Sequence, residues 1–333
     1  MTETRNDQCL EGRRAWVLTD GKMGDRAQCL GLAERLGLDI EERVVAPGRP
    51  WHWFLPRGPI PPGDRPDQPG SPVHPPFPDL VIASGRRAAA YLPVIKKASA
   101  GRVFTVFLKD PRIGTGFADF IWVPAHDRLR GGNVMVTDTA PHRISPDVLE
   151  SARAVVPEDW VQLPRPWLGL VVGDPTGGRG DQDQTGSAVL GQLEPLVRQA
   201  GSILVTPSRR TPAAFLEALS QHLAEKPFWI WSGEGDNPYR QILAQSDLLA
   251  VTGDSHNMVS EVLAAGCPVS VLRPPQLNPK LARFLDKLPQ QGAVGDQKAS
   301  CAAGYPQIDA TPAIAQALAQ AFSDFQQLVT SES

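Results

Sequence analysis

The chain has 333 residues, 41% hydrophobic and 21% charged, and a formal net charge of -3, which suits a folded protein of about two domains. This charge, without a basic stripe, argues against a nucleic-acid partner. No stretch approaches the roughly 18 apolar residues of a membrane-spanning helix, and the N-terminus lacks a signal-peptide core. The four cysteines show no zinc or disulfide spacing. We therefore expect a cytoplasmic protein with no metal and no resident cofactor.

Strands and helices alternate through the first half of the chain, which predicts a parallel sheet. We expect strands at 15–19, 44–47, 79–85, 103–108, 119–124 and 133–137 and helices at 25–37 and 87–98. A proline-rich insertion at 47–79 interrupts this pattern. Two interpretations of its apolar residues Trp51, Trp53 and Phe54 stay open. They fill a gap in the core, or they form an exposed patch for peripheral contact with the inner face of a membrane.

The alternation restarts after a proline-punctuated linker at 156–167. We expect strands at 167–173, 202–208, 228–231, 247–254 and 268–272 and helices at 186–200, 212–224, 237–246 and 257–265. The last apolar stretch has helical spacing and predicts a C-terminal helix that crosses back over the domain junction. The expected divisions are a first domain at 1–155, a second at 168–310, and the helix and tail at 311–333. This layout predicts an α/β, GT-B-like fold of two Rossmann-like domains with a cleft between them.

The loop after the first strand reads TDGKMG, residues 19–24. Its glycines let the backbone approach a ligand, and the following helix presents N–H groups to an anion. Gly21, Lys22 and Gly24 are therefore candidate ligand-binding residues. The loop lacks the spacing of a nicotinamide or P-loop motif, and the alternative is a tight turn without a ligand. Asp20, at the end of the strand, is the first candidate for a catalytic base.

Two histidines are further candidates for catalysis. His126 and His142 follow strands of the first half, where either could face the cleft as a general base. A lone histidine is more often structural, so both interpretations are kept.

Two loops of the second half carry anion-binding features. Gly177, Gly178 and Arg179 follow its first strand and can cradle a phosphate. Ser208 and Arg209 follow its second strand, where an arginine can clamp an anion. The second loop also has the residues of an ordinary helix start, and both readings can hold.

The strongest pattern is TGDSHNMVSEV at 252–262, which leads from a strand into a helix. A helix start there would stabilise a diphosphate, and an acidic residue one turn later can accept hydrogen bonds from ribose hydroxyls. The alternative is a capping role for Ser255. Together with two residues of the SGEGDNPY segment that could touch the base, the candidate ligand-binding residues are Asn237, Tyr239, Asp254, Ser255, His256, Asn257, Met258 and Glu261.

Several motifs carry a family resemblance. In chain order they are WVLTDGKMGDRAQCLGLAERLG, FLKDPR, VPAHDRL, APHRIS, GGRG, TPSRRTP, SGEGDNPY and VTGDSHNMVSEVLAAGCPV. Together they resemble the ELM-type mitochondrial fission family over residues 16–272. The resemblance implies a GT-B glycosyltransferase-like fold. Bacterial members look like glycosyltransferases and have been labelled nucleoside-diphosphate-sugar epimerases, whereas the plant member is described as a recruiter of a dynamin-related protein.

Three functions therefore stay open. The first is a metal-independent, inverting glycosyl transfer from a nucleotide-sugar donor to a glycan or lipid-linked acceptor, as in cell-envelope glycan synthesis. Fixed N–H groups and arginine would stabilise its leaving group. The second is a nucleoside-diphosphate-sugar epimerase on the same fold. The third is a non-catalytic membrane or dynamin-type adaptor.

Overall fold

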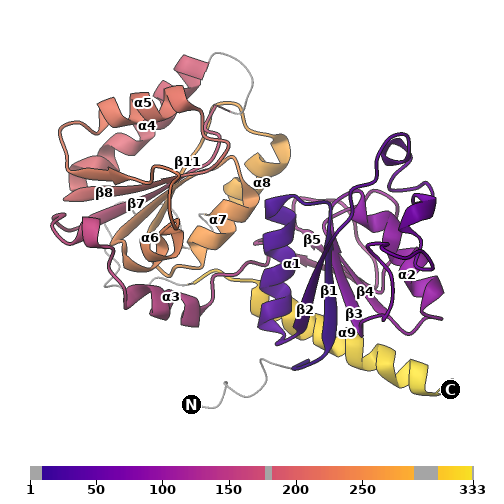
Figure 1. The fold of residues 1–333 in the computed structure, drawn as a ribbon. Coiled ribbons are helices and arrows are strands. Elements are labelled where there is room, and N and C mark those ends of the chain that lie inside the picture. The colour runs from indigo at the N-terminus through magenta and orange to yellow at the C-terminus, as the bar shows by residue number, and fades with distance from the viewer. Residues whose placement is uncertain (1–9, 177–181, 289–306, 332–333) are drawn as a thin grey trace. The chain divides into compact units, whose positions relative to one another are not determined.

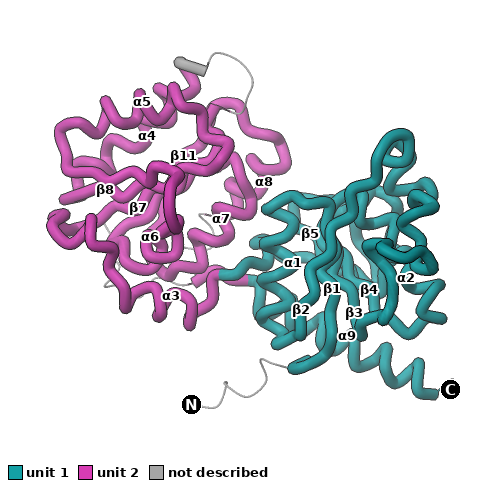
Figure 2. Tube along the Cα trace, viewed as in Figure 1, with its two compact units in different colours: residues 1–143, 310–333 teal, residues 144–309 magenta. Residues whose placement is uncertain are grey.

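The structure of the chain, a computed structural model, describes residues 10–176, 182–288 and 307–331. It divides into two α/β units (Figures 1 and 2). Unit 1 comprises residues 1–143 and 310–333, and unit 2 comprises residues 144–309. The chain therefore returns to unit 1 after unit 2 is complete.

Unit 1 is built on a six-stranded parallel sheet. Its strands are β1 (Arg14–Thr19), β2 (Asp39–Val44), β3 (Leu80–Ser84), β4 (Phe104–Leu108), β5 (Phe120–Pro124) and β6 (Val134–Thr137). Their order in the sheet is β2-β1-β3-β4-β5-β6. The central strands are buried on both faces, which is why each reads as a nearly continuous apolar run in the sequence.

Helices cover both faces of this sheet. One face carries α1 (Met23–Arg35) and α9 (Thr311–Ser331), and the other carries α2 (Tyr91–Ala98). The ring of Phe322 in α9 lies edge-on to Phe104 of β4, with 5.5 Å between the ring centroids. The C-terminal helix thus completes the core of unit 1, as Figure 1 shows in yellow.

The proline-rich segment 47–79 is part of unit 1 and contributes to the core beneath α2. Leu55 is fully buried there, whereas Trp53 and Phe54 are 62% and 57% exposed and Trp51 is half-buried. The segment therefore both fills the core and leaves two large apolar side chains on the surface. None of the helices within the described ranges is long and apolar enough to cross a membrane.

Unit 2 is built on a five-stranded parallel sheet. Its strands are β7 (Trp167–Val172), β8 (Ser202–Pro207), β9 (Phe228–Ile230), β10 (Leu248–Thr252) and β11 (Val269–Leu272). Their order is β11-β10-β7-β8-β9. The chain moves outward from β7 to β9 and then crosses back to β10 on the other side of β7, which is the strand order of a Rossmann fold.

The helices of unit 2 also form two layers. One core is shared by α3 (Pro146–Arg153), α6 (Tyr239–Gln245), α7 (His256–Leu263) and α8 (Pro279–Lys287), and the other by α4 (Gln182–Gln199) and α5 (Ala213–His222). Short 3₁₀ helices are η1 (Trp51–Trp53), η2 (Pro62–Asp64) and η3 (Ala88–Ala90) in unit 1 and η4 (Glu158–Trp160) in unit 2. Both units therefore have the helix–sheet–helix layers of Rossmann-like domains.

The unit boundary and one strand differ from the expectation. The division falls after residue 143 rather than residue 155, because α3 packs on α6 of unit 2. The Gln245 side chain joins them by donating hydrogen bonds to the carbonyl oxygens of Ala152 and Val155. The second strand spans Asp39–Val44 instead of 44–47, since this largely exposed strand at the sheet edge has a polar sequence.

The cysteines also differ from the expectation. Cys267 is disulfide-bonded, and Cys29 is a free, buried thiol. Spacing alone did not reveal the bridge, because the pairing of cysteines cannot be deduced from sequence alone.

Candidate functional site

The two units share a feature at the carboxyl edge of their sheets, the edge at which open α/β sheets bind ligands. In each sheet the order in which the chain adds strands reverses between two adjacent parallel strands. These strands are β1 and β3 in unit 1 and β7 and β10 in unit 2. At both reversals, an aspartate that follows one strand packs against a glycine that follows the other. These are the positions from which the fold can present side chains to a ligand.

In unit 1 this pair is Asp20, directly after β1, and Gly85, directly after β3. Gly85 has a φ of 99°, and a Cβ atom at this position would lie 2.8 Å from the Asp20 carboxyl carbon, so the position requires glycine. The Asp20 side chain is 3% exposed, and its Oδ2 accepts a hydrogen bond from Lys22 Nζ at 3.2 Å. Asp20 Oδ1 is buried without a hydrogen-bond partner in the part of the chain that the structure describes.

The rest of this loop forms the start of α1. The Gly21 N–H donates to Thr19 Oγ1 at 3.3 Å, and Gly24 lies in the first turn of the helix. Lys22 occupies the N-cap position without a side-chain capping bond. A helix start of this kind is suited to an anion.

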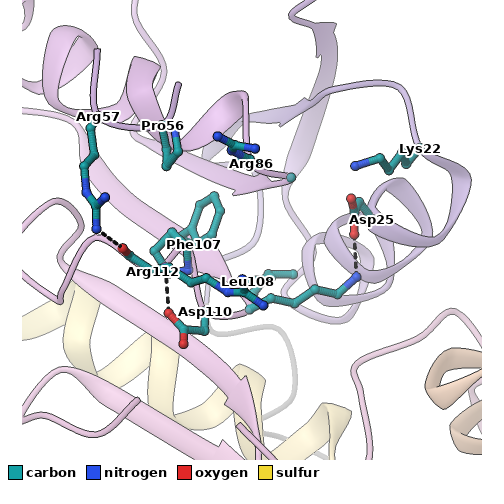
Figure 3. A pocket seen from close by; sticks show the side chains of 12 residues that line it. Lys22, Asp25, Pro56, Arg57, Arg86, Phe107, Leu108, Asp110 and Arg112 are labelled. Carbon is teal, nitrogen blue, oxygen red and sulfur yellow. Dashed lines mark hydrogen bonds and ion pairs between the residues drawn. The ribbon is translucent and has the colours of Figure 1, made fainter. Parts of the chain in front are cut away.

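A cavity of about 700 Å³ opens next to this loop (Figure 3). Its lining residues are Lys22, Asp25, Pro56, Arg57, Gly85, Arg86 and the six residues of the FLKDPR motif, 107–112. In Figure 3, Pro56, Arg57 and Arg86 lie opposite the 107–112 segment, and Lys22 and Asp25 lie at one end. Five lining side chains are cationic and two are acidic, so the cavity favours a negatively charged ligand.

Contacts within the lining fix the cationic side chains. Lys109 forms an ion pair with Asp25 of α1. Arg57 Nη2 donates to the Arg112 carbonyl oxygen at 2.9 Å, and Arg86 Nε donates to a backbone carbonyl oxygen of the proline-rich segment at 2.9 Å. These two hydrogen bonds position the guanidinium groups of Arg57 and Arg86. Because the acceptors are neutral carbonyl oxygens, the bonds do not neutralise the positive charges.

The two candidate histidines do not line this cavity. His142 is buried at 4% exposure, and its backbone N–H donates to Thr311 Oγ1 at 3.2 Å where α9 begins. Gly31 of α1 packs directly on the His142 backbone, so this position joins α1 to α9. His126 is half-buried in the loop that follows β5.

In unit 2 the corresponding pair is Gly173, directly after β7, and Asp254, which follows β10. A Cβ atom on Gly173 would overlap the Asp254 carboxylate. Asp254 Oδ2 accepts hydrogen bonds from the Asp174 N–H at 2.9 Å and from Arg210 Nη2 at 3.1 Å, and its Oδ1 accepts one from Thr252 Oγ1 at 2.6 Å. Asp254 therefore ties three loop ends together at the sheet edge.

The helix α7 begins immediately after this aspartate. Ser255 is its N-cap, and its side chain accepts a hydrogen bond from the Met258 N–H at 3.5 Å. The His256 ring packs edge-on against Phe284 of α8, with 4.4 Å between the ring centroids, and Asn257 is half-buried. The capping role of Ser255 is thus present, and the helix start still faces the carboxyl edge of the sheet.

Glu261 lies one turn further and is linked to α6. Its Oε2 accepts a hydrogen bond from the Tyr239 hydroxyl at 2.7 Å. Burial raises the pKa of Glu261, and the Tyr239 hydrogen bond opposes this effect. Burial, the Glu261 charge and the same hydrogen bond raise the pKa of Tyr239 well above its ordinary value. Asn237, just before Tyr239, accepts a hydrogen bond from Thr206 Oγ1 at 3.2 Å, so these residues meet at one end of α6.

The loop after β8 places its two arginines differently. Arg210 pairs with Asp254, whereas Arg209 is exposed. The Ser208 N–H donates to Thr211 Oγ1 at 2.9 Å, which shapes the turn into α5. Of the predicted ligand residues, Gly177, Gly178 and Arg179 lie outside the described residues.

The sequence interpretation missed most of the cavity in unit 1. Arg86, Lys109 and Arg112 were not selected, although the last two belong to the FLKDPR motif. The available signal was a lysine and an arginine placed directly after a buried strand, at the edge where ligands bind.

These strand orders and layers define the class of the protein as a GT-B-like α/β fold. Over 95% of this chain and 98% of the other, with 13% identity and a TM-score of 0.51, the structure is similar to one provisionally described as a UDP-N-acetylglucosamine 2-epimerase from Listeria monocytogenes. A glycosyltransferase from Rickettsia africae is similar over 94% of this chain and 99% of the other, with 11% identity and a TM-score of 0.48. At these identities the likeness concerns the fold.

The family follows from the sequence match. Residues 23–322 match the family described as Mitochondrial fission ELM1, and the chain belongs to that family. It is 26% identical over 262 residues to the Mitochondrial fission protein ELM1 of Arabidopsis thaliana, an alignment that covers 70% of this chain. The chain spans 61% of the length of that relative. The family expected from the sequence motifs is thereby confirmed.

Proposed function

We propose that this chain is a glycosyltransferase-like enzyme whose unit 2 binds a nucleotide-sugar donor. The observation that carries the proposal is the arrangement at the end of β10, where the start of α7 is followed one turn later by the Glu261–Tyr239 pair. A helix start stabilises a diphosphate, and a carboxylate at that distance suits a ribose. Neither group needs a metal ion for this role.

The neighbouring loops supply the remaining contacts in this proposal. The exposed Arg209 would pair with the diphosphate and stabilise the charge that develops as the sugar leaves. Asn237 and Tyr239 would lie against the base or the ribose. Asp254 would act indirectly, because its carboxylate already holds the loop ends that frame the site.

Asp20 of unit 1 is the proposed general base for the acceptor hydroxyl. Its buried Oδ1 has no hydrogen-bond partner among the described residues, but Lys22 and Gly85 lie against the carboxylate. Proton transfer therefore requires the Lys22 side chain, which is 68% exposed, to move aside. We expect Asp20→Asn to abolish turnover while donor binding is kept. Unchanged turnover in a kinetic assay would remove Asp20 from this role.

A thermal-shift screen against UDP, GDP, ADP, CMP and their sugars tests donor binding. A ligand at about 100 times its dissociation constant stabilises the native state by about 2.7 kcal/mol. We expect a shift with one nucleotide, loss of that shift in Glu261→Ala, and a reduced shift in Tyr239→Phe. The melting temperature of each variant without nucleotide is the control for folding. Equal shifts in the wild type and Glu261→Ala would contradict the ribose role.

An epimerase on the same fold is the second candidate, because the structure resembles one described by that activity. The two functions differ in their need for an acceptor. An epimerase converts the nucleotide-sugar when no acceptor is present, whereas a transferase leaves the nucleotide-sugar unconverted until an acceptor is added. If no nucleotide binds, the adaptor function is favoured, and vesicle binding through the exposed Trp53 and Phe54 becomes the next assay.

A further inference from the structure

We propose that the arginine-lined cavity of unit 1 binds a phosphate group of the acceptor. This inference deepens the proposed function, on which it rests, by naming the chemical class of the acceptor. The cavity, of about 700 Å³, lies at the reversal between β1 and β3, next to the proposed base Asp20. It is large enough for a phosphorylated organic molecule rather than a single ion.

The charges of the lining point to a phosphate. Lys109 is paired with Asp25, and Lys22 with Asp20. The three arginines form no ion pair with a carboxylate in the ranges that the structure describes; they are Arg57, Arg86 and Arg112. Planar guanidinium groups bind phosphate oxygens in a bidentate manner, which makes arginine the usual residue for this role.

The backbone of the FLKDPR segment supports the same site. Three non-glycine residues of the described chain have a positive φ, and two of them, Lys109 at 84° and Arg112 at 60°, line this cavity. Such conformations cost free energy and persist where the surrounding structure enforces them, often at ligand sites. The Asp110 Oδ1 accepts a hydrogen bond from the Arg112 N–H at 2.7 Å and holds this bend. The strained bend thus carries two of the five cationic side chains of the lining.

The hydrogen bonds of the arginines show how they are positioned. Arg86 uses its Nε to bind the proline-rich segment, so its two terminal amino groups are available to a ligand. Arg57 uses one terminal amino group to hold the Arg112 carbonyl oxygen. Both arginines therefore tie the proline-rich segment to the cavity wall, as Figure 3 shows for Arg57 and Arg112.

Isothermal titration of the full chain with inorganic pyrophosphate tests this site. We expect saturable binding that is at least tenfold weaker in the double variant Arg86→Gln/Arg112→Gln. The matched control is Lys97→Gln, which removes a positive charge from an exposed position of α2 outside the cavity. Each single variant is measured as well, together with its melting temperature, so that loss of folding is recognised.

Equal affinity in the wild type and the double variant would overturn the proposal. If Arg209→Gln abolishes pyrophosphate binding and the cavity variants do not, the phosphate site belongs to unit 2; this result also overturns the inference but leaves the donor proposal standing. Conversely, pyrophosphate binding that depends on the cavity, without any nucleotide binding, would contradict the donor proposal alone.

Sedimentation with vesicles distinguishes the sources of the phosphate. Vesicles of phosphatidylcholine with and without phosphatidic acid are compared for the wild type and the double variant. Binding that requires both phosphatidic acid and the two arginines assigns a lipid headgroup. Pyrophosphate binding without vesicle binding assigns a water-soluble phosphate compound. Both results support the phosphate site.

Discussion

Gly85 is the residue whose replacement tests the site of unit 1 most simply. We expect Gly85→Ala to lower the free energy of unfolding by about 1–3 kcal/mol, because the new side chain must adopt a φ of 99° and approach the Asp20 carboxylate. Urea denaturation measures this change. Gly116→Ala, in open space within the same unit, is the control, and an equal effect of both substitutions would refute the close contact.

The Glu261–Tyr239 pair predicts a pH dependence. Because the pKa of Glu261 is raised in the folded state, the folded protein binds more protons than the unfolded chain between the ordinary glutamate value of about 4.3 and the raised pKa. Wild-type stability should therefore be greatest below this window and fall, relative to Glu261→Gln, as the pH rises through it. Urea midpoints of both proteins at a series of pH values measure the difference.

Tyr239→Phe sharpens this test. It removes the hydrogen bond that lowers the pKa of Glu261, so the pH window of lost stability should extend to higher pH. A pH profile identical to that of the wild type would show that the hydroxyl does not act on the carboxylate.

At the level of single residues, sequence reasoning identified strand ends but not side-chain partners. It selected Arg209 but did not foresee that the neighbouring Arg210 pairs with Asp254. It selected His142 from its place after a strand, yet this residue is buried where α1 meets α9. Such choices depend on which way a loop turns, and neighbouring positions of a loop look alike in sequence.

Among the elements, the helix α9 allows a buried and an exposed apolar residue of the same helix to be compared. Phe322 is buried against the sheet of unit 1, and Leu328 is exposed. We expect Phe322→Ala to destabilise unit 1 by about 3–5 kcal/mol through loss of buried area and its contact with Phe104. Leu328→Ala should have almost no effect. Chemical denaturation of both variants checks this, and equal losses would contradict the packing of α9.

Buried strands were easier to locate from the sequence than exposed ones. Strands such as β3 and β4, buried on both faces, read as plain apolar runs and were located to within one residue at each end. The edge strand β2 was misplaced because its sequence, DIEERV, is mostly polar. The helix α8 was not predicted, because it follows a proline-rich turn and buries only two of its residues, Phe284 and Leu285.

On the scale of the whole molecule, the alternation of strands and helices was enough to predict a GT-B-like α/β fold, which the strand orders and the structural comparison confirm. The ordered motifs were enough to predict the family. The cavity of unit 1 could not be predicted, since its lining comes from four segments that only folding brings together, including the proline-rich one. The helical spacing of the last apolar stretch predicted the C-terminal helix α9, but not that this helix packs in the core of unit 1.

Hydrogen–deuterium exchange with and without the nucleotide found in the thermal-shift screen tests the central claim most directly. The account predicts slower exchange in unit 2, at the start of α7 from Ser255 to Glu261 and at the end of α6 near Tyr239. Unit 1 should change little until a phosphorylated acceptor is added, and then at Arg86 and at 107–112. Protection by the nucleotide confined to these segments of unit 1, with α7 unchanged, would contradict the assignment of the donor site to unit 2.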